Sequence, residues 1–284
     1  MLKYYNKIII VILIIIIITY IINTINNINQ IDYKYNISIN QKYLVIQYDN
    51  RDLSNHPYNK LITVNKEYCK LNNLDYIYIK NNYNNYPPYW VKVKILYDFI
   101  NNDKYKYYDG FIWLDSDAVF SNKHKNILSL INNKYSFYIS PDTLTFDVSA
   151  VLNISDIYDD VNLFHIFIYD IINNINNIIP FPTPLCAGVF LVKNNQVGKN
   201  IINTWWSKYN SKKWIYNNNS WHTDGIWAGI DYEQGSFNTY IYPEFKNSIK
   251  VLYSSALSDI NNKHPNSYVS HYMGGRKKFI DHHY

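Results

Sequence analysis

The sequence GFIWLDSDAVF, at residues 110–120, joins a short apolar run to two closely spaced aspartates. Its first part, Gly110–Leu114, is typical of a buried strand. Asp115 and Asp117 follow at the end of this strand, where both carboxylates can approach one ion. Hard cations such as Mg²⁺ and Mn²⁺ prefer carboxylate oxygen, and they bridge to phosphate oxygens. We therefore predict a metal-binding turn here, with a solvated acidic turn as the alternative.

Further strands and helices are predicted on the N-terminal side of this turn. Apolar runs at Tyr43–Tyr48 and 75–80 predict buried strands. Helical spacing predicts a helix at Tyr58–Leu71 and a second one that Pro87-Pro88 opens and that continues through Ile100. Strands that alternate with helices indicate a parallel sheet with covering helices, whose ligands bind beyond the carboxyl ends of the strands. The polar residues that follow the predicted strands are Asp49, Arg51, Asp115 and Asp117. Topology and chemistry therefore indicate one site at this edge.

The chain after residue 120 is less regular. Apolar runs at 135–140 and 187–192 predict two more strands, and the spacing at 200–209 predicts a helix. The low-complexity stretch 170–179 is compatible with a helix or with a loop insertion. No repeat of solenoid length is visible in the sequence, so we expect a single folded domain.

Residues 8–22, IIIVILIIIIITYII, are almost entirely apolar. A cleaved signal peptide is the main alternative to an anchor, but no small-residue cleavage site follows. Lys3 and Lys7 precede the run, and the positive-inside rule assigns them to the cytoplasm. The predicted organisation is a cytoplasmic tail at 1–7, a transmembrane signal-anchor at 8–22, a stem at 23–41 and a folded domain at 42–284. We therefore expect a single-pass type II membrane protein with a lumenal domain, as in the Golgi or the endoplasmic reticulum.

Composition excludes little but argues against one class of partner. The net charge is +5, and the lysines are scattered without a dense basic run that carries interleaved aromatics. We therefore expect no nucleic-acid partner. The two cysteines, Cys69 and Cys186, do not make a disulfide framework. They can pair in an oxidising lumen or stay as two buried thiols, and the sequence leaves both alternatives open.

The 110–120 segment resembles the D-x-D segment of GT-A-fold glycosyltransferases. It is most similar to glycosyltransferase family 34, which contains fungal α-galactosyl- and α-mannosyltransferases and plant xyloglucan xylosyltransferases. The other matching segments are, in chain order, Asn65-Lys66-Glu67-Tyr68-Cys69, Asp75-Tyr76, Trp90-Val91-Lys92, 187–194, Trp205-Trp206, Glu233-Gln234 and 271–277. Where the family usually has Asn before Ala-Gly, this chain has Cys186, which puts donor preference in doubt.

The resemblance implies an α/β chain with the GT-A fold: a Rossmann-like mixed sheet flanked by helices in a single catalytic domain. It also implies transfer of a sugar, with retention, from a nucleotide-sugar donor (a UDP-hexose, a UDP-pentose or GDP-mannose) to a glycan or glycoprotein acceptor. The implied cofactor is Mn²⁺ or Mg²⁺. Whether the protein forms a homo-oligomer is left open. The alternatives are an enzyme of another D-x-D family with a different acceptor, and a non-catalytic lumenal lectin or assembly factor of the same fold.

The resemblance also implies roles for individual residues. The implied metal ligands are Asp115, Asp117 and His271. Gly274 and Gly275 would let backbone amides approach the diphosphate, and Arg276 and Lys277 would neutralise it as it leaves. The other implied substrate-binding residues are Asp115, Ser116, Arg51 and Gly188. A solvated basic tail is the alternative for Arg276 and Lys277.

Glu233 and Gln234 are the implied catalytic pair, with Gln234 on the sugar face near the anomeric carbon. Glu233 or Asp231 could act as a nucleophile or could orient an acceptor hydroxyl, and the sequence does not decide between these roles. The candidate stacking platforms for an acceptor sugar are Trp205, Trp206, Trp221 and Trp227. For Trp205 we favour core packing.

Overall fold

The computed structural model describes residues 41–54, 56–80, 83–141, 185–252, 254–259, 267–274 and 280. The predicted tail, the anchor at 8–22, almost all of the stem, and the 170–179 stretch lie outside the described residues. Among the helices of the described part, none combines the length and apolar character that a membrane crossing requires. The domain boundaries therefore stay predictions.

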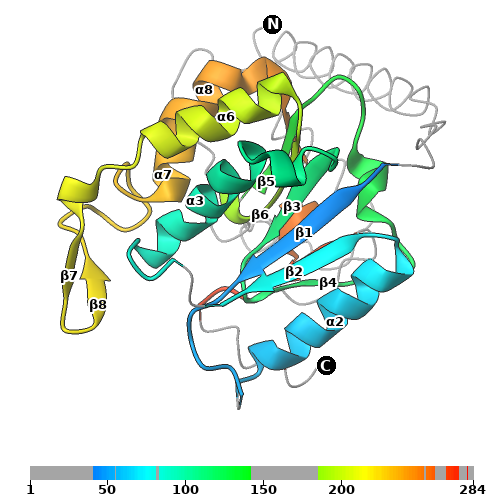
Figure 1. Ribbon diagram of the computed structural model, residues 1–284, viewed down its shortest axis with the longest axis horizontal. Coiled ribbons are helices and arrows are strands. Elements are labelled where there is room, and N and C mark those ends of the chain that lie inside the picture. Colours follow the sequence, from blue (N-terminus) through cyan, green and yellow to red (C-terminus); the bar gives the residue numbers. More distant parts are fainter. Residues whose placement is uncertain are drawn as a thin grey trace, which may run out of the picture. The chain divides into compact units, whose positions relative to one another are not determined.

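A six-stranded mixed sheet forms the centre of the domain (Figure 1). Its strands, in spatial order, are β2 (Asp75–Ile79), β1 (Tyr43–Tyr48), β3 (Gly110–Leu114), β6 (Leu185–Lys193), β5 (Phe137–Pro141) and β9 (Ile249–Val251). β1 runs parallel to both β2 and β3, and β5 runs parallel to β9. β6 runs antiparallel to β3 and β5. The parallel sheet indicated by strand–helix alternation is thus confirmed for the first three strands, and the sheet as a whole is mixed.

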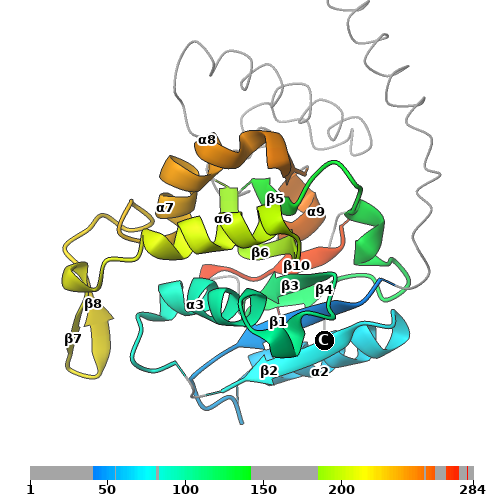
Figure 2. The same cartoon turned by 45° about the horizontal axis from the view of Figure 1, so that its top comes forward.

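The central strands are mostly apolar because helices cover both faces of the sheet. On β3, Phe111 and Trp113 pack into one core, whereas Ile112 and Leu114 pack into another on the opposite face. The first core also contains α3 (Pro88–Ile100) and α6 (Gln196–Ser207), and the second contains residues of α2 (Tyr58–Leu71) and α9 (Ser254–Ser258). Figure 2 shows α3 and α6 on one side of the sheet and α2 on the other.

The helix boundaries follow local signals. α2 has the predicted bounds, and α3 begins at Pro88, where a proline loses no helical hydrogen bond. α6 begins at Gln196 rather than at 200, because the Asn195 side chain caps the helix by accepting a hydrogen bond from the amide of Gly198. Trp205 on α6 is fully buried, which confirms its predicted place in the core.

A small second sheet joins distant parts of the chain. β4 (Ala118–Phe120) follows the aspartates directly and pairs antiparallel with β10 (Val269–His271). In this register His271 lies opposite Ala118. The C-terminal part of the chain is therefore held beside the Asp115–Asp117 turn.

The remaining elements are short. The helices among them are η1 (Asp103–Tyr105), η2 (Ile127–Leu130), η3 (Ser211–Lys213), α7 (Glu233–Ser236), η4 (Phe237–Ile241), α8 (Tyr242–Phe245) and η5 (Lys246–Ser248). The strands β7 (Ile215–Asn217) and β8 (Ser220–His222) form a hairpin. Asn218 and Asn219, between them, both have positive φ, as a tight type I′ turn requires. The hairpin lies at the edge of the domain toward which β1 runs (Figure 1).

Candidate active site

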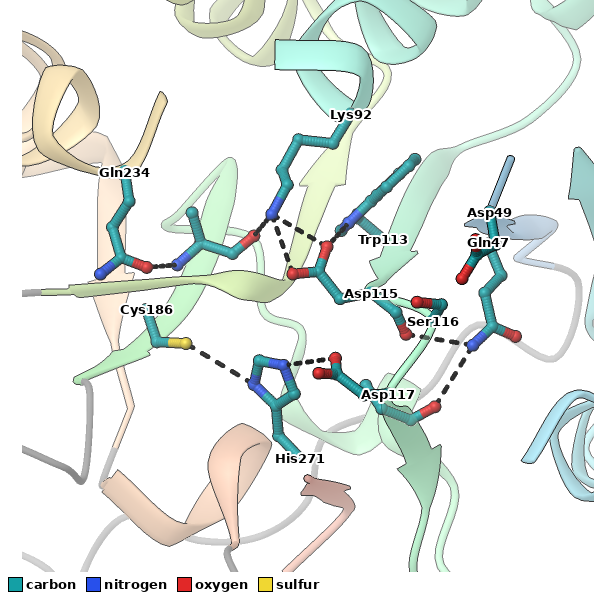
Figure 3. Close-up of polar contacts among 12 residues, drawn as sticks. Gln47, Asp49, Lys92, Trp113, Asp115, Ser116, Asp117, Cys186, Gln234 and His271 are labelled. Carbon is teal, nitrogen blue, oxygen red and sulfur yellow. Dashed lines mark hydrogen bonds and ion pairs between the residues drawn. The ribbon is translucent and has the colours of Figure 1, made fainter. Parts of the chain in front are cut away.

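Two aspartates and a histidine meet at the end of β3. One ligand atom from each of Asp115, Asp117 and His271 lies within 4.8 Å of the others. Nε2 of His271 is 3.0 Å from Oδ1 of Asp117 (Figure 3). Burial alone would lower the pKa of His271, but the charge and hydrogen bond of Asp117 raise it well above its ordinary value. Two carboxylates and an imidazole that converge in this way suit Mn²⁺ or Mg²⁺, so the residues fit the implied metal.

The position of His271 depends on a glycine in β6. A Cβ added to Gly188 would lie 2.0 Å from Cε1 of His271, so the imidazole occupies the space of a side chain at position 188. On its other side Nδ1 of His271 is 3.7 Å from Sγ of Cys186. Gly188 therefore makes room for the histidine, and its implied contact with substrate stays a prediction.

Buried amides hold the backbone of the aspartate turn. Nδ2 of Asn65 and Nε2 of Gln47 both donate to the carbonyl oxygen of Ala118, at 3.0 and 3.4 Å, and Gln47 also donates to that of Asp115, at 3.0 Å. Oδ1 of Asn65 accepts from the amide of Phe120. Both side chains are fully buried, so these bonds are costly to lose. The only sequence signal for Gln47 is a polar residue inside an apolar strand.

Lys92 is a buried cation that the sequence analysis did not identify as a site residue. Its Nζ is 2.9 Å from Oδ1 of Asp115, 3.2 Å from Oε1 of Glu233 and 3.1 Å from the carbonyl oxygen of Ala187. Burial alone would lower the pKa of Lys92, but the two carboxylates raise it above its ordinary value. Nε1 of Trp113 donates to the same Asp115 carboxylate, at 2.7 Å. The available signal was a lysine within the apolar Trp90-Val91-Lys92-Val93 segment of a helix.

The implied catalytic pair lies beside Lys92. Glu233 is buried, and burial raises its pKa although Lys92 acts in the opposite direction. Gln234 is partly exposed, and its Oε1 accepts a hydrogen bond from the amide of Ala187, at 3.0 Å (Figure 3). Glu233 therefore neutralises Lys92, and Gln234 is fixed to β6.

A cavity of about 350 Å³ opens at the carboxyl ends of β1 and β3. Its walls are formed by Tyr48, Asp49, Asn50, Arg51, Pro88, Tyr89, Lys92, Trp113, Asp115, Ser116 and Asp117. The guanidinium of Arg51 donates to both oxygens of Asp49 and, at 3.0 Å, to Oγ of Ser116. Burial would raise the pKa of Asp49, but hydrogen bonds from Arg51 outweigh it and lower the pKa. This volume suits a small-molecule ligand.

The structure thus brings most of the expected residues together. Asp115, Ser116, Asp117 and Arg51 line the cavity, and His271 joins the two aspartates. Gly274 is exposed with φ +59°, a conformation that favours glycine. Gly275, Arg276 and Lys277 lie outside the described residues. The sequence left open whether Cys69 and Cys186 pair; in the structure both thiols are free and buried.

A known protein family matches most of the chain. Residues 40–231 match the model of the galactosyl transferase GMA12/MNN10 family. The matched range contains Asp115 and Asp117 but ends before Glu233, Gln234 and His271. No curated protein matches the chain.

Solved structures of several glycosyltransferases are similar to this chain. A glycosyltransferase involved in glycosylation of the major capsid of PBCV-1 is similar at 16% identity with a TM-score of 0.53, over 86% of this chain and 100% of that chain. Mouse xyloside xylosyltransferase 1 has 12% identity and a TM-score of 0.36, over 75% and 85% of the two chains. The galactosyltransferase LgtC, in complex with donor and acceptor sugar analogs, has 11% identity and a TM-score of 0.38, over 84% and 95%.

The first of these similarities shows a mixed α/β fold that resembles the GT-A glycosyltransferases. The family match covers more than half of the chain. The chain therefore belongs to the galactosyl transferase GMA12/MNN10 family of glycosyltransferases.

Proposed function

We propose that this glycosyltransferase moves a sugar, with retention, from a nucleotide-sugar donor to a glycan or glycoprotein acceptor, and that it requires Mn²⁺ or Mg²⁺. The donor class is a UDP-hexose, a UDP-pentose or GDP-mannose. One observation carries the proposal: Asp117 and His271, 154 residues apart in sequence, meet with Asp115 at a cavity of nucleotide-compatible size.

Asp115, Asp117 and His271 would hold the ion. A divalent cation there supplies charge stabilisation for a departing diphosphate. Lys92 orients the Asp115 carboxylate through its ion pair, and Trp113 orients it through a hydrogen bond. Arg51 is half exposed at the cavity and offers a fixed guanidinium to an anionic or hydroxyl-bearing part of the donor.

The roles of Glu233 and Gln234 differ in this proposal. Glu233 is buried and paired with Lys92, so we assign it a positioning role through that lysine rather than direct attack on the sugar. Gln234 is partly exposed next to Ala187, and we assign it the contact with the donor sugar. Gly274 to Lys277 complete the diphosphate site in this proposal.

We also propose that residues 8–22 anchor the enzyme as a type II membrane protein with its catalytic domain in a Golgi- or endoplasmic-reticulum-like lumen. The unbroken apolar run and the two preceding lysines support this topology. Alkaline extraction and protease protection of the full chain in membrane vesicles would test it. Release by alkali, or cleavage of the domain in sealed vesicles, would contradict the anchor or its orientation.

A donor screen tests the activity. The full chain, purified with detergent, is incubated with UDP- and GDP-sugars and with Mn²⁺, Mg²⁺ or a chelator. We expect metal-dependent turnover of one donor class, loss of it in Asp117→Ala and His271→Ala, and its retention in Asp98→Asn, a control carboxylate on α3 outside the cavity. The anomeric configuration of the product, measured by NMR, tests retention. Glycan binding without turnover of any donor would instead favour the lectin or assembly-factor alternative.

A further inference from the structure

A cluster of three aromatic side chains, Tyr89, Trp227 and Tyr232, adjoins the cavity and joins different segments of the chain. Trp227 is 67% exposed, and its ring lies edge-on to Tyr89, with ring centroids 5.1 Å apart. Tyr232 packs against both rings, at 5.0 and 5.2 Å. Tyr89 is also a wall of the cavity that contains Lys92 and Asp115. The aromatic surface of Trp227 therefore continues directly into the cavity wall.

The segment that carries Trp227 is fixed to the rest of the domain. The carbonyl oxygen of Asp231 accepts hydrogen bonds from the indoles of Trp90, at 2.8 Å, and Trp214, at 3.2 Å. Ala228 adopts a positive φ of 57°, a conformation that costs a non-glycine residue energy. A Cβ on Gly235 would lie 2.0 Å from the carbonyl oxygen of Gly229, so the segment also packs closely on α7. These contacts therefore fix the backbone of the segment that carries the exposed indole of Trp227.

Charge indicates what kind of partner this surface suits. The segment 220–232, SWHTDGIWAGIDY, contains two aspartates and no lysine or arginine. Membrane-surface segments combine apolar residues with basic ones, so this segment is unsuited to an anionic bilayer. An exposed indole that packs on a tyrosine ring instead suits a neutral sugar, whose C–H face packs on an aromatic ring.

We propose that Trp227 and Tyr89 form the binding platform for a neutral glycan acceptor, which enters along this surface to reach the donor in the cavity. This inference rests on the proposed sugar transfer. It selects Trp227 from the four tryptophans considered above. Trp205 is buried in the core. Trp206 packs on Tyr86 and Tyr97, and Trp221 packs on Tyr216, and none of these tyrosines lines the cavity.

The test compares Trp227→Ala with Tyr216→Ala in the full chain. Tyr216 is a matched control, because it is 57% exposed on β7 and packs on Trp221 rather than on Tyr89. With the donor found by the screen and a panel of neutral manno-, gluco- and galacto-oligosaccharides, Trp227→Ala is expected to raise the acceptor KM about tenfold. Donor hydrolysis without acceptor should keep its kcat and KM, and Tyr216→Ala should change neither activity.

Distinct outcomes separate the two proposals. An unchanged acceptor KM in Trp227→Ala, with donor hydrolysis present, overturns the platform alone. If no donor is hydrolysed, the proposed transfer fails. The platform is then tested by the change in indole fluorescence when the protein is titrated with the same oligosaccharides. Loss of this change in Trp227→Phe supports the platform, and an unaltered change overturns it. Quenching of Trp227 by brominated lipids around the reconstituted full chain, or preference for an anionic glycan, also overturns it.

Discussion

Gly188 and His271 share one space: the imidazole lies where a side chain at position 188 would project, with Cε1 of His271 2.0 Å from the position of an added Cβ. Gly188 belongs to β6, beside β3, and His271 belongs to β10, which pairs with β4. The absence of a side chain at Gly188 on β6 therefore lets the imidazole of His271, which belongs to the other sheet, reach Asp117. In the proposed metal site, Gly188 would therefore influence metal binding without touching the metal.

Gly188→Ala is expected to displace the imidazole. Overpacking of this kind costs about 1–3 kcal/mol of unfolding free energy, and misplacement of a ligand lowers Mn²⁺ affinity about tenfold or more. Urea unfolding and Mn²⁺ titration would measure both effects. The control is the same change in a His271→Ala background, where the three nearest atoms to the new Cβ are absent. An equal cost in both backgrounds would contradict the steric explanation.

Lys92→Met is expected to destabilise the fold strongly, because Glu233 and Asp115 lose their buried cation. Removal of one partner from a buried ion pair costs about 3–5 kcal/mol, and the 29% exposure of the Asp115 side chain favours the lower end of this range. Lys94→Met is the matched control on the same helix, where the more exposed pair with Asp98 is worth about 0–1 kcal/mol.

Urea unfolding of both variants measures the difference. Addition of Glu233→Gln to Lys92→Met should recover part of the lost stability, since it removes one of the buried carboxylates. Similar unfolding free energies for Lys92→Met and Lys94→Met would show that the Lys92 ion pairs do not support the fold.

Asp49 is expected to make the fold sensitive to acid. Because Arg51 lowers the pKa of Asp49 in the folded state, the stabilisation is fully present above the unfolded pKa of about 3.9 and is lost as pH falls through the lower folded pKa. The stability advantage of the wild type over Asp49→Asn should therefore be constant above about pH 5 and should shrink below about pH 4. Urea unfolding of both proteins at a series of pH values, from above about pH 5 to below about pH 4, measures this stability difference. Parallel pH dependences of the two proteins would contradict the prediction.

The two thiols are expected to be unreactive in the folded protein. Cys69 and Cys186 are free and buried, and burial raises the pKa of Cys69 above its ordinary value. Ellman's reagent near pH 8 should detect neither thiol in the native chain and both in guanidinium chloride without reductant. Absence of thiols in the denatured, unreduced chain would indicate a disulfide instead.

The elements around β3 were largely predictable because their signals are local. The bounds of β1, β3 and α2 agree with the predicted ones, and α3 begins at the Pro87-Pro88 pair as expected. Asp115 and Asp117 at the end of an apolar run also indicated the edge of the sheet at which the cavity lies, since ligands bind beyond strand ends. The start of α6 was missed because the cap at Asn195 lies before the apolar periodicity begins.

The roles of Lys92 and Gly188 were not predictable from position alone. A lysine on an apolar helix is ordinarily assigned to the surface. Its burial is tolerable because the fold brings Asp115 and Glu233, the latter 141 positions later in the chain, to its ammonium group. The resemblance suggested His271 as a metal ligand, but its distance to Asp117 depends on the β4–β10 pairing. Trp227 likewise became distinct from the other candidate tryptophans only through its exposure and its contact with Tyr89.

The sequence by itself determined the alternation of strands and helices and the place of the acidic turn, because these depend on the spacing of neighbouring side chains. Tertiary structure decided which charges pair, which glycine gives space to His271, and which aromatic ring borders the cavity. These depend on close packing between segments far apart in the chain, where contact distances of a few ångströms are set by the whole fold. The acidic turn was thus predicted locally, and the fold brought His271 and Lys92 to its two aspartates.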